Sequence, residues 1–162
     1  MVFIDCPLNI GQEFLSFFRE KREDSLVGFC VLGSIFSEGI DLLGDRLIGV
    51  LIVGTGLPGI GMERDIIQEY FDQHGKKGYD YAYRFPGMNK VLQAAGRVIR
   101  STQDVGVITL LDERFLWKEN QYLLPDDWDR YYEVSLINYD KILRDFWSKA
   151  EESGFFDPED KK

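Results

Sequence analysis

Length, composition and charge already restrict what this chain can be. It has 162 residues, of which 44% are apolar and 29% are charged, a balance typical of one globular domain and unlike disordered, collagen-like or disulfide-rich chains. The formal net charge of −9 argues against unaided binding to a phosphate backbone, because long-range attraction to nucleic acid needs an excess of Lys and Arg. We therefore expect any nucleic-acid contact to be local.

The cysteines and the apolar runs indicate a compartment. The two cysteines, Cys6 and Cys30, are too few for a metal knuckle or a disulfide framework, and two reduced thiols are typical of a cytosolic protein. The apolar runs are far shorter than the roughly 20 residues that a membrane-spanning helix needs, and the first residues do not resemble a secretory leader. We therefore expect a cytoplasmic protein without a membrane partner.

The first predicted elements are a short strand at Val2–Ile4 and a helix at Gln12–Glu20. Bounded apolar runs predict three more strands, and helical spacing predicts two helices between the last two strands. Because the runs are continuous, we expect both faces of a parallel sheet to be covered, which gives an α/β class with about four strands flanked by helices. These strands are Leu26–Leu32, Leu47–Val53 and Val105–Asp112, and the helices are Met62–His74 and Asn89–Arg100.

After Asp112 the pattern changes to short aromatic-rich helical pieces. Glu113–Glu119 is the first, Pro125 breaks the pattern, and Asn138–Glu152 is the longest. We expect the last eight residues to fray. The predicted organisation is one domain over residues 1–128 with a helical appendage over residues 129–162, packed on the same domain.

The segment Gln93–Arg100, with the sequence QAAGRVIR, is the most informative. At about 100° per residue a helix would place Gln93, Arg97 and Arg100 within an arc of about 60°, with Leu92, Ala95 and Ile99 on a separate face. Two arginines three residues apart on one helix face repel each other unless an anion lies before them. Gly96 between them weakens the helix, which would be explained if another backbone must approach closely. Helical geometry by itself does not decide between a phosphate site and a surface helix whose arginines pair with carboxylates such as Asp104.

A second polar segment follows the strand that ends at Leu32. Ligands of open α/β sheets gather at the carboxyl ends of strands, so this loop is well placed for function, although a simple polar turn at Gly39 has the same features. The chemistry-bearing residues of this loop are Ser34, Ser37, Glu38 and Asp41.

Three other features receive simpler interpretations. The glycines of Gly54-x-Gly56-x-x-Gly59 match a dinucleotide fingerprint, but Pro58 and Gly61 stand where its helix should begin. His74 is the only histidine, and a place at a helix end before Gly75 explains it. The alternating Tyr79, Tyr81 and Tyr83 could stack bases, but a half-buried extended segment accounts for them better.

Taken in order, these motifs resemble the second RecA-like motor domain of superfamily-two helicases, a P-loop NTPase fold, and are most similar to its DinG and XPD branch. The resemblance covers about residues 14–128 and implies the C-terminal half of the motor of a bacterial ATP-dependent DNA helicase involved in DNA repair, truncated at its N-terminal side. The motifs are GS-x-F-S-EGID-L at Gly33–Leu42, LP at Leu57 and Pro58, Q-x-x-GR-x-IR at Gln93–Arg100, D-x-GV at Asp104–Val107 and L-D-x-R at Leu111–Arg114.

The resemblance also implies roles for single residues. Arg97 and Arg100 would be arginine fingers that reach the γ-phosphate of ATP, with Gln93 as a nearby polar contact. Gly39 and Asp41 would face ATP, while Ser37 and Glu38 would couple the nucleotide to single-stranded or forked DNA. Leu57 and Pro58 would lie near the DNA, although the glycines around them depart from the family's pattern.

The sequence lacks a G-x-x-x-x-G-K-[ST] phosphate loop, which holds the β- and γ-phosphates in such enzymes. The resemblance assigns ATP and Mg²⁺ binding to a first RecA-like domain of the same parent protein, where some members also carry an iron–sulfur cluster. We therefore expect this chain alone to bind no cofactor and to be inactive. The open alternative is a stand-alone, non-catalytic α/β module that binds a nucleotide or a protein.

Overall fold

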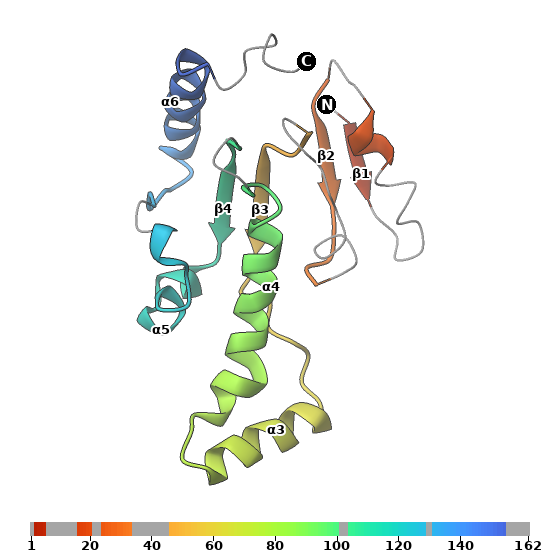
Figure 1. Cartoon of the computed structure of the whole chain (residues 1–162), viewed down its shortest axis with the longest axis vertical. Helices are drawn as coiled ribbons and strands as arrows, with labels where there is room; N and C mark the ends of the chain where they lie inside the picture. Colours follow the sequence, from red (N-terminus) through yellow and green to blue (C-terminus); the bar gives the residue numbers. More distant parts are fainter. Residues whose placement is uncertain are drawn as a thin grey trace.

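The residues that the structure describes form four short strands, arranged as two parallel pairs. The computed structural model describes residues 2–5, 16–20, 24–33, 46–100, 104–128 and 131–154, with only the backbone of residues 2–5. Strand β1 (Val2–Asp5) pairs with β2 (Leu26–Phe29), and β3 (Gly49–Val53) pairs with β4 (Val107–Leu111). The arrows of β2, β3 and β4 point the same way (Figure 1). The α/β class with parallel strands is confirmed.

The single sheet of about four strands is not formed by the residues that the structure describes, because β2 and β3 share no ladder. Strand β2 ends at Phe29 and not at Leu32. Leu32 instead packs against the hydrophobic core around α4. The apolar run from Leu26 therefore serves two purposes, a strand and a core contact, and run length alone does not separate them.

The side chains on the two faces of β3, in the β3–β4 pair, differ in how far they are buried. Val50 and Ile52 lie toward the core, with Ile52 only 3% exposed, whereas Leu51 and Val53 are 62% and 76% exposed. The expectation that both faces are covered is therefore wrong for β3. Successive strand residues point to opposite faces, and within the described part of the chain only one of those faces is packed along the length of β3.

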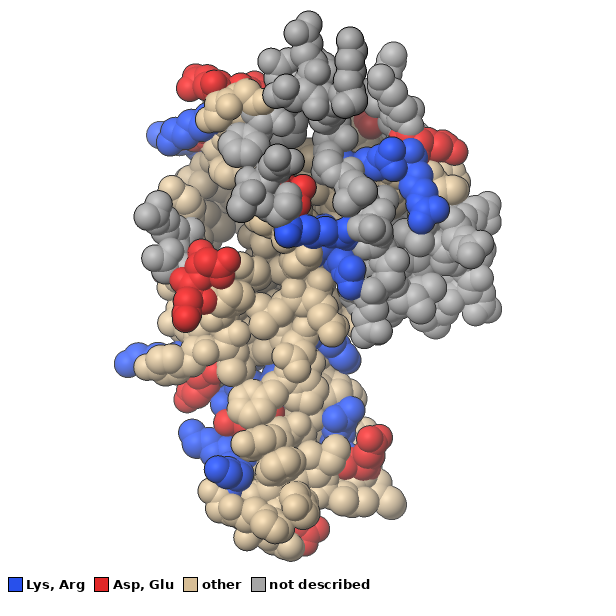
Figure 2. Space-filling model, viewed as in Figure 1, with Lys and Arg blue, Asp and Glu red and all other residues tan. Residues whose placement is uncertain are grey.

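Helix α3 (Met62–Gln73) lies within one residue of its prediction, and its C-cap is His74, followed by Gly75 at φ +69°. The next segment, η2 (Asp80–Arg84), is a π-helix, so the predicted extended segment is wrong. Ring stacking explains the difference: Tyr79 stacks on Tyr83 four residues later at 5.3 Å, and Tyr81 stacks on Phe71 of α3 at 3.8 Å. The lower end of the molecule, where α3 and η2 lie, has mostly uncharged surface between scattered charges (Figure 2).

Helix α4 (Phe85–Ala95) supplies the centre of the core. Met88, Val91 and Ala95 are at most 2% exposed and cluster with Ile52 of β3 and Phe115. Burying a side chain of the size of Met88 or Val91 stabilises the fold by roughly 1.5–3 kcal/mol. Helix α4 is therefore fixed against β3.

The remaining chain forms short helical elements, as its pattern predicts. They are η3 (Glu113–Leu116), α5 (Lys118–Gln121), η4 (Asp126–Trp128) and α6 (Tyr139–Glu152). Tyr139, the first residue of α6, hydrogen-bonds through its hydroxyl to the Thr109 hydroxyl of β4 at 3.0 Å. The division at residue 128 stays a prediction, and the last eight residues lie outside the described part of the chain.

Candidate functional site

The predicted arginine helix ends earlier than expected. Helix α4 stops at Ala95, and Gly96 is its C-cap with φ −65° and ψ −1°, its N–H donating to the Leu92 carbonyl at 2.9 Å. The single helical face of Gln93, Arg97 and Arg100 is therefore wrong, because only Gln93 is on the helix. Arg97 and Arg100 lie in the turn that follows it.

The packing side of this segment also differs from prediction. Ala95 is buried as expected, but Ile99 is 45% exposed and Val98 is buried instead. A side chain at Gly96 would come nearest to the Leu92 carbonyl oxygen, at 3.2 Å, so no other described element approaches this glycine closely. The physical reason is the end of the helix: beyond Ala95 the rotation per residue changes, and Val98 takes the buried position.

The segment Gly96–Arg100, which we call the arginine turn, follows α4 and presents the two arginines at the amino-terminal edge of β3 and β4, where Val98 and Ile48 lie beside Gly106. Arg100 is exposed and Arg97 is partly buried. The backbone N–H of Arg100 donates to Asp104 Oδ2 at 2.9 Å, so Asp104 helps to order the turn. The turn then enters β4, where the Val107 N–H donates to the Ile48 carbonyl at 3.0 Å.

The second predicted site segment, with Ser34, Ser37, Glu38, Gly39 and Asp41, lies outside the described residues. The residues that flank it are described. Gly33, at φ +83°, lies so close to Lys90 of α4 that a Cβ there would be 2.9 Å from the lysine Cδ. Arg46 lies just before β3, whose amino-terminal edge carries the arginine turn. The residues on the two sides of this segment therefore adjoin α4 and β3, and these elements also position Gln93, Arg97 or Arg100.

The loop after β3 does not have the geometry of a dinucleotide fingerprint. Gly54 and Gly56 have φ of +82° and +65°, but α3 begins only at Met62, after Gly61 as its N-cap. Asp80 lies in η2 and not at a strand end. Leu57 is 37% exposed in this loop. The structure thus argues against a dinucleotide-binding loop at Gly54–Gly59, as the sequence predicts.

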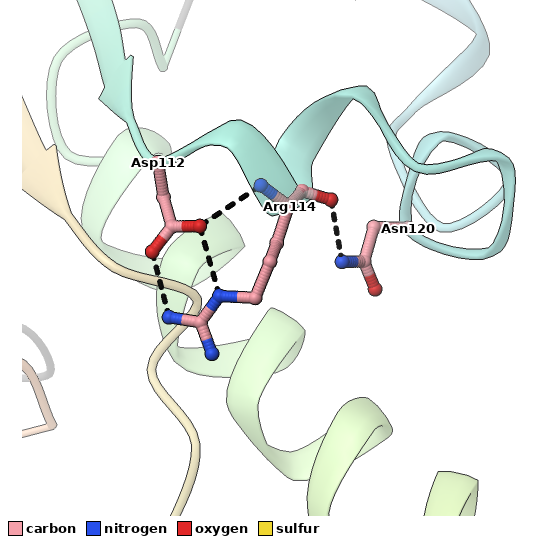
Figure 3. Close-up of polar contacts among 3 residues, drawn as sticks. All are labelled: Asp112, Arg114 and Asn120. Atoms are coloured by element: carbon pink, nitrogen blue, oxygen red, sulfur yellow. Dashed lines mark hydrogen bonds and ion pairs between the residues drawn. The ribbon is translucent and has the colours of Figure 1, made fainter.

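The carboxyl end of β4 carries an ion pair whose geometry the sequence did not reveal. Arg114 donates from Nε and Nη2 to the two carboxylate oxygens of Asp112 at 2.8 and 2.6 Å, and its backbone N–H donates to Asp112 Oδ1 at 2.9 Å (Figure 3). The Asn120 amide donates to the Arg114 carbonyl at 2.7 Å (Figure 3). The hydrogen bond from Arg114 lowers the pKa of Asp112 and raises the pKa of Arg114. In the sequence, the only indication of this ion pair is the L-D-x-R spacing at Leu111–Arg114.

Two further properties limit the chemistry of the described residues. Among the described residues, no group of three or more His, Cys, Asp or Glu side chains could hold a metal ion. Among the same residues, no helix has the length and apolar character to cross a membrane.

Comparison with known proteins now adds to this geometry. Residues 9–131 match the family described as the helicase C-terminal domain. The chain is 28% identical to the Fanconi anemia group J protein homolog of Gallus gallus over 91% of its length, and 30% identical to regulator of telomere elongation helicase 1 of Homo sapiens over 88%. It is also 28% identical, over 80% of its length, to the "probable ATP-dependent helicase" of Methanocaldococcus jannaschii.

The chain spans only a small part of these relatives: 12% of the Gallus gallus protein, 22% of the Methanocaldococcus jannaschii protein and 11% of the Homo sapiens protein. The family match covers the β2, β3 and β4 strands, α4 and the arginine turn. The chain therefore belongs to the helicase C-terminal domain family and is homologous to helicases of the DinG and XPD group.

Proposed function

We propose that this chain is the C-terminal motor domain of an ATP-dependent DNA helicase and that Arg97 and Arg100 act on the γ-phosphate of ATP. The observation that supports this most is the place of the arginine turn. It presents an exposed Arg100 directly after α4, the helix that also contacts Gly33 at the start of the EGID segment. The two motifs that resemble the nucleotide-responsive parts of such helicases thus share one supporting helix.

The proposed reaction places ATP between a first RecA-like domain and this one. Closure of the two domains brings the guanidinium groups of Arg97 and Arg100 to the γ-phosphate, where they stabilise charge on the transferring phosphoryl group. Each of the two planar guanidinium groups can bind phosphate oxygens through parallel N–H donors. Gln93, on the last turn of α4, would contact the same group, and hydrolysis would reopen the cleft.

The EGID segment would link this site to DNA. In the proposal Gly39 and Asp41 face the nucleotide, and Ser37 and Glu38 couple it to single-stranded or forked DNA. The chain's net charge of −9 means that DNA would be held by local contacts and by the partner domain, because the net charge repels a phosphate backbone at long range. Opening and closing would then move the strand.

Replacing Arg100 with alanine in the full-length protein tests the proposal. Loss of one finger should lower kcat for DNA-stimulated ATP hydrolysis by about 10³-fold or more, because stabilisation of the transition state is lost. ATP affinity should change little, since the phosphate loop of the other domain holds the nucleotide. Steady-state turnover and fluorescent-nucleotide binding measure the two quantities.

Arg144→Ala is the matched control for this experiment. Arg144 is an exposed arginine on α6, paired with Asp140 at 2.8 Å, so its loss should leave turnover unchanged. Near-normal turnover by Arg100→Ala, or an equal loss in both variants, would remove the finger assignment.

The 162-residue chain by itself should hydrolyse no ATP. It lacks the phosphate loop that holds the β- and γ-phosphates in such enzymes. A phosphate-release assay with Mg²⁺ and single-stranded DNA measures this. Robust turnover by the purified chain would contradict the two-domain account, and a parent gene without any phosphate loop would favour the stand-alone binding module instead.

A further inference from the structure

The D-x-GV motif at Asp104–Val107 follows the arginine turn along the chain and leads into β4. Two of its residues, Asp104 and Gly106, contact the turn at different points. Neither residue is among those proposed to act on ATP or DNA. Because a mutation away from the reacting atoms can still displace a catalytic group, residues that hold the arginine turn are candidates for a positioning role.

Gly106 leaves the space in which Val98 is buried. Val98 stands between the two arginines in the sequence and is 4% exposed. A Cβ at Gly106 would lie 2.2 Å from Val98 Cγ1, whereas ordinary contact begins at 3.4 Å. The backbone of Gly106 is not in the left-handed region, so its conformation is one that alanine can adopt. Glycine is therefore required at this position for space.

The turn cannot easily give way to a side chain at Gly106. Branching at Cβ restricts the rotamers of Val98, and close packing leaves a buried valine little room for another one. On the other side, the same Cβ would lie 3.0 Å from the Ile48 carbonyl oxygen, which accepts from the Val107 N–H at 3.0 Å. A methyl group at Gly106 would thus push Val98 away from β3 by about 1 Å, since 2.2 Å must become at least 3.4 Å.

The backbone of the turn is also held on both sides of Val98. At its start, the N–H groups of Arg97 and Val98 donate to the carbonyls of the last two residues of α4 at 3.2 and 3.0 Å. At its end, Asp104 Oδ2 accepts from the backbone N–H of Arg100 at 2.9 Å. The buried valine and these hydrogen bonds together fix the main chain that carries both guanidinium groups.

We propose that Gly106 and Asp104 are positioning residues that hold the two arginines of the arginine turn where phosphoryl transfer needs them. Gly106 acts by accommodating Val98, and Asp104 acts by accepting from the backbone of Arg100. A displacement of about 1 Å can cost about 10²-fold in rate, so the loss of either contact should appear in kcat. The inference rests on the proposed function, because it assigns the arginines to the γ-phosphate.

Gly106→Ala in the full-length protein tests the first contact. Its kcat for DNA-stimulated ATP hydrolysis should fall about tenfold or more, while fluorescent-nucleotide binding should stay unchanged because the other domain holds the nucleotide. Adding Val98→Ala removes the methyl group that collides, so the double variant should turn over faster than Gly106→Ala alone. A residue that served stability alone would give the opposite order, because the second change removes a buried side chain.

Phe71→Leu is the matched control for a loss of stability. It removes a ring that stacks on Tyr81 at 3.8 Å, in α3, which lies at the opposite end of α4 from the arginine turn (Figure 1). Circular dichroism selects a temperature at which every variant is folded, and at that temperature Phe71→Leu should retain the wild-type kcat.

Asp104 provides a second pair of variants that does not alter the core. Asp104→Asn keeps an oxygen that can accept from the Arg100 N–H, whereas Asp104→Ala removes it. The alanine variant should lose about tenfold or more in kcat, and the asparagine variant should retain most of it. ATP binding should be normal in both.

Wild-type kcat in Gly106→Ala, or no gain from adding Val98→Ala, would overturn the role of Gly106. Equal kcat in Asp104→Ala and Asp104→Asn would overturn the role of Asp104. Arg100→Ala separates these failures from a failure of the proposed function. If Arg100→Ala loses turnover while the Gly106 and Asp104 variants keep it, only the positioning role is wrong, and near-normal turnover in Arg100→Ala would overturn both.

Discussion

At the scale of single residues, the Asp112–Arg114 pair links the end of β4 to the helical segments that follow. Asp112 accepts from the backbone and the side chain of Arg114, so it both caps η3 and neutralises the arginine. The side chains are 17% and 34% exposed, so solvent screens part of their attraction. This pair orders the polypeptide at the carboxyl end of β4.

Asp112→Ala should destabilise the protein more than Asp112→Asn. Alanine removes the cap and the ion pair, for a loss of about 1–2 kcal/mol in the free energy of unfolding at neutral pH. Asparagine keeps an oxygen that can cap and loses only the charge, so its cost should be about half as large. Urea denaturation followed by circular dichroism measures both. Equal stability of the alanine variant and the wild type would show that the pair does not support the fold.

The same pair predicts a direction for the effect of pH. The pKa of Asp112 in the folded state is lowered, first by the hydrogen bond from Arg114. Its contribution to stability is therefore fully present above the unfolded pKa of about 3.9 and is lost as pH falls through the lowered value. The stability difference between wild type and Asp112→Asn should be constant from pH 7 to about 5 and shrink in more acidic solution. A difference that grows on acidification would contradict this.

At the scale of elements, α4 is held against the β3 loop by an approach of two backbones. A Cβ at Gly87 would lie 2.5 Å from the Thr55 carbonyl oxygen, and one at Gly56 would lie 2.7 Å from the Gly87 carbonyl oxygen. Thr55 is itself buried. The position of α4 therefore depends on the close backbone contact between Gly56 and Gly87. The positions of Gln93 and the arginine turn depend on it too.

Gly87→Ala should therefore cost about 1–3 kcal/mol in the free energy of unfolding, because the added methyl group overpacks the contact and forces the backbones apart. Gly59→Ala is the control, since a Cβ at Gly59 would meet nothing within 4 Å. Chemical denaturation of both variants gives the two values. A Gly87→Ala protein as stable as Gly59→Ala would mean that the approach is looser than described.

The helices also show which element bounds can be predicted from the sequence and which cannot. Strong helical periodicity identified α3 and α6 to within about one residue, because their ends coincide with His74–Gly75 and Asn138. The end of α4 was missed because Gly96 tolerates both a helix and its termination, and the choice depends on Val98 packing in the core. The tyrosines of η2 were misassigned because stacking with Phe71 is a tertiary contact that local alternation does not contain.

At the scale of the whole molecule, the sequence motifs are sufficient to identify the family, and the match of residues 9–131 confirms it. What the motifs could not supply is the placement of Arg97 and Arg100. A helix face was the simplest geometry for Gln93, Arg97 and Arg100, whereas the structure separates the amide on α4 from the guanidinium groups in the turn. In the proposed function this turn lets the arginines extend from the domain toward a nucleotide held elsewhere.

The most direct test of that claim is trapping of ADP with aluminium fluoride, which imitates the transferring phosphoryl group, in the full-length protein. The affinity ratio of trapped to simple ADP complexes reports interactions made only in the transition state. If Arg97 and Arg100 are fingers, the wild type should trap the complex, while Arg97→Lys and Arg100→Lys should bind ADP normally and lose most of the trapping. Trapping by both lysine variants at the wild-type level would contradict the account.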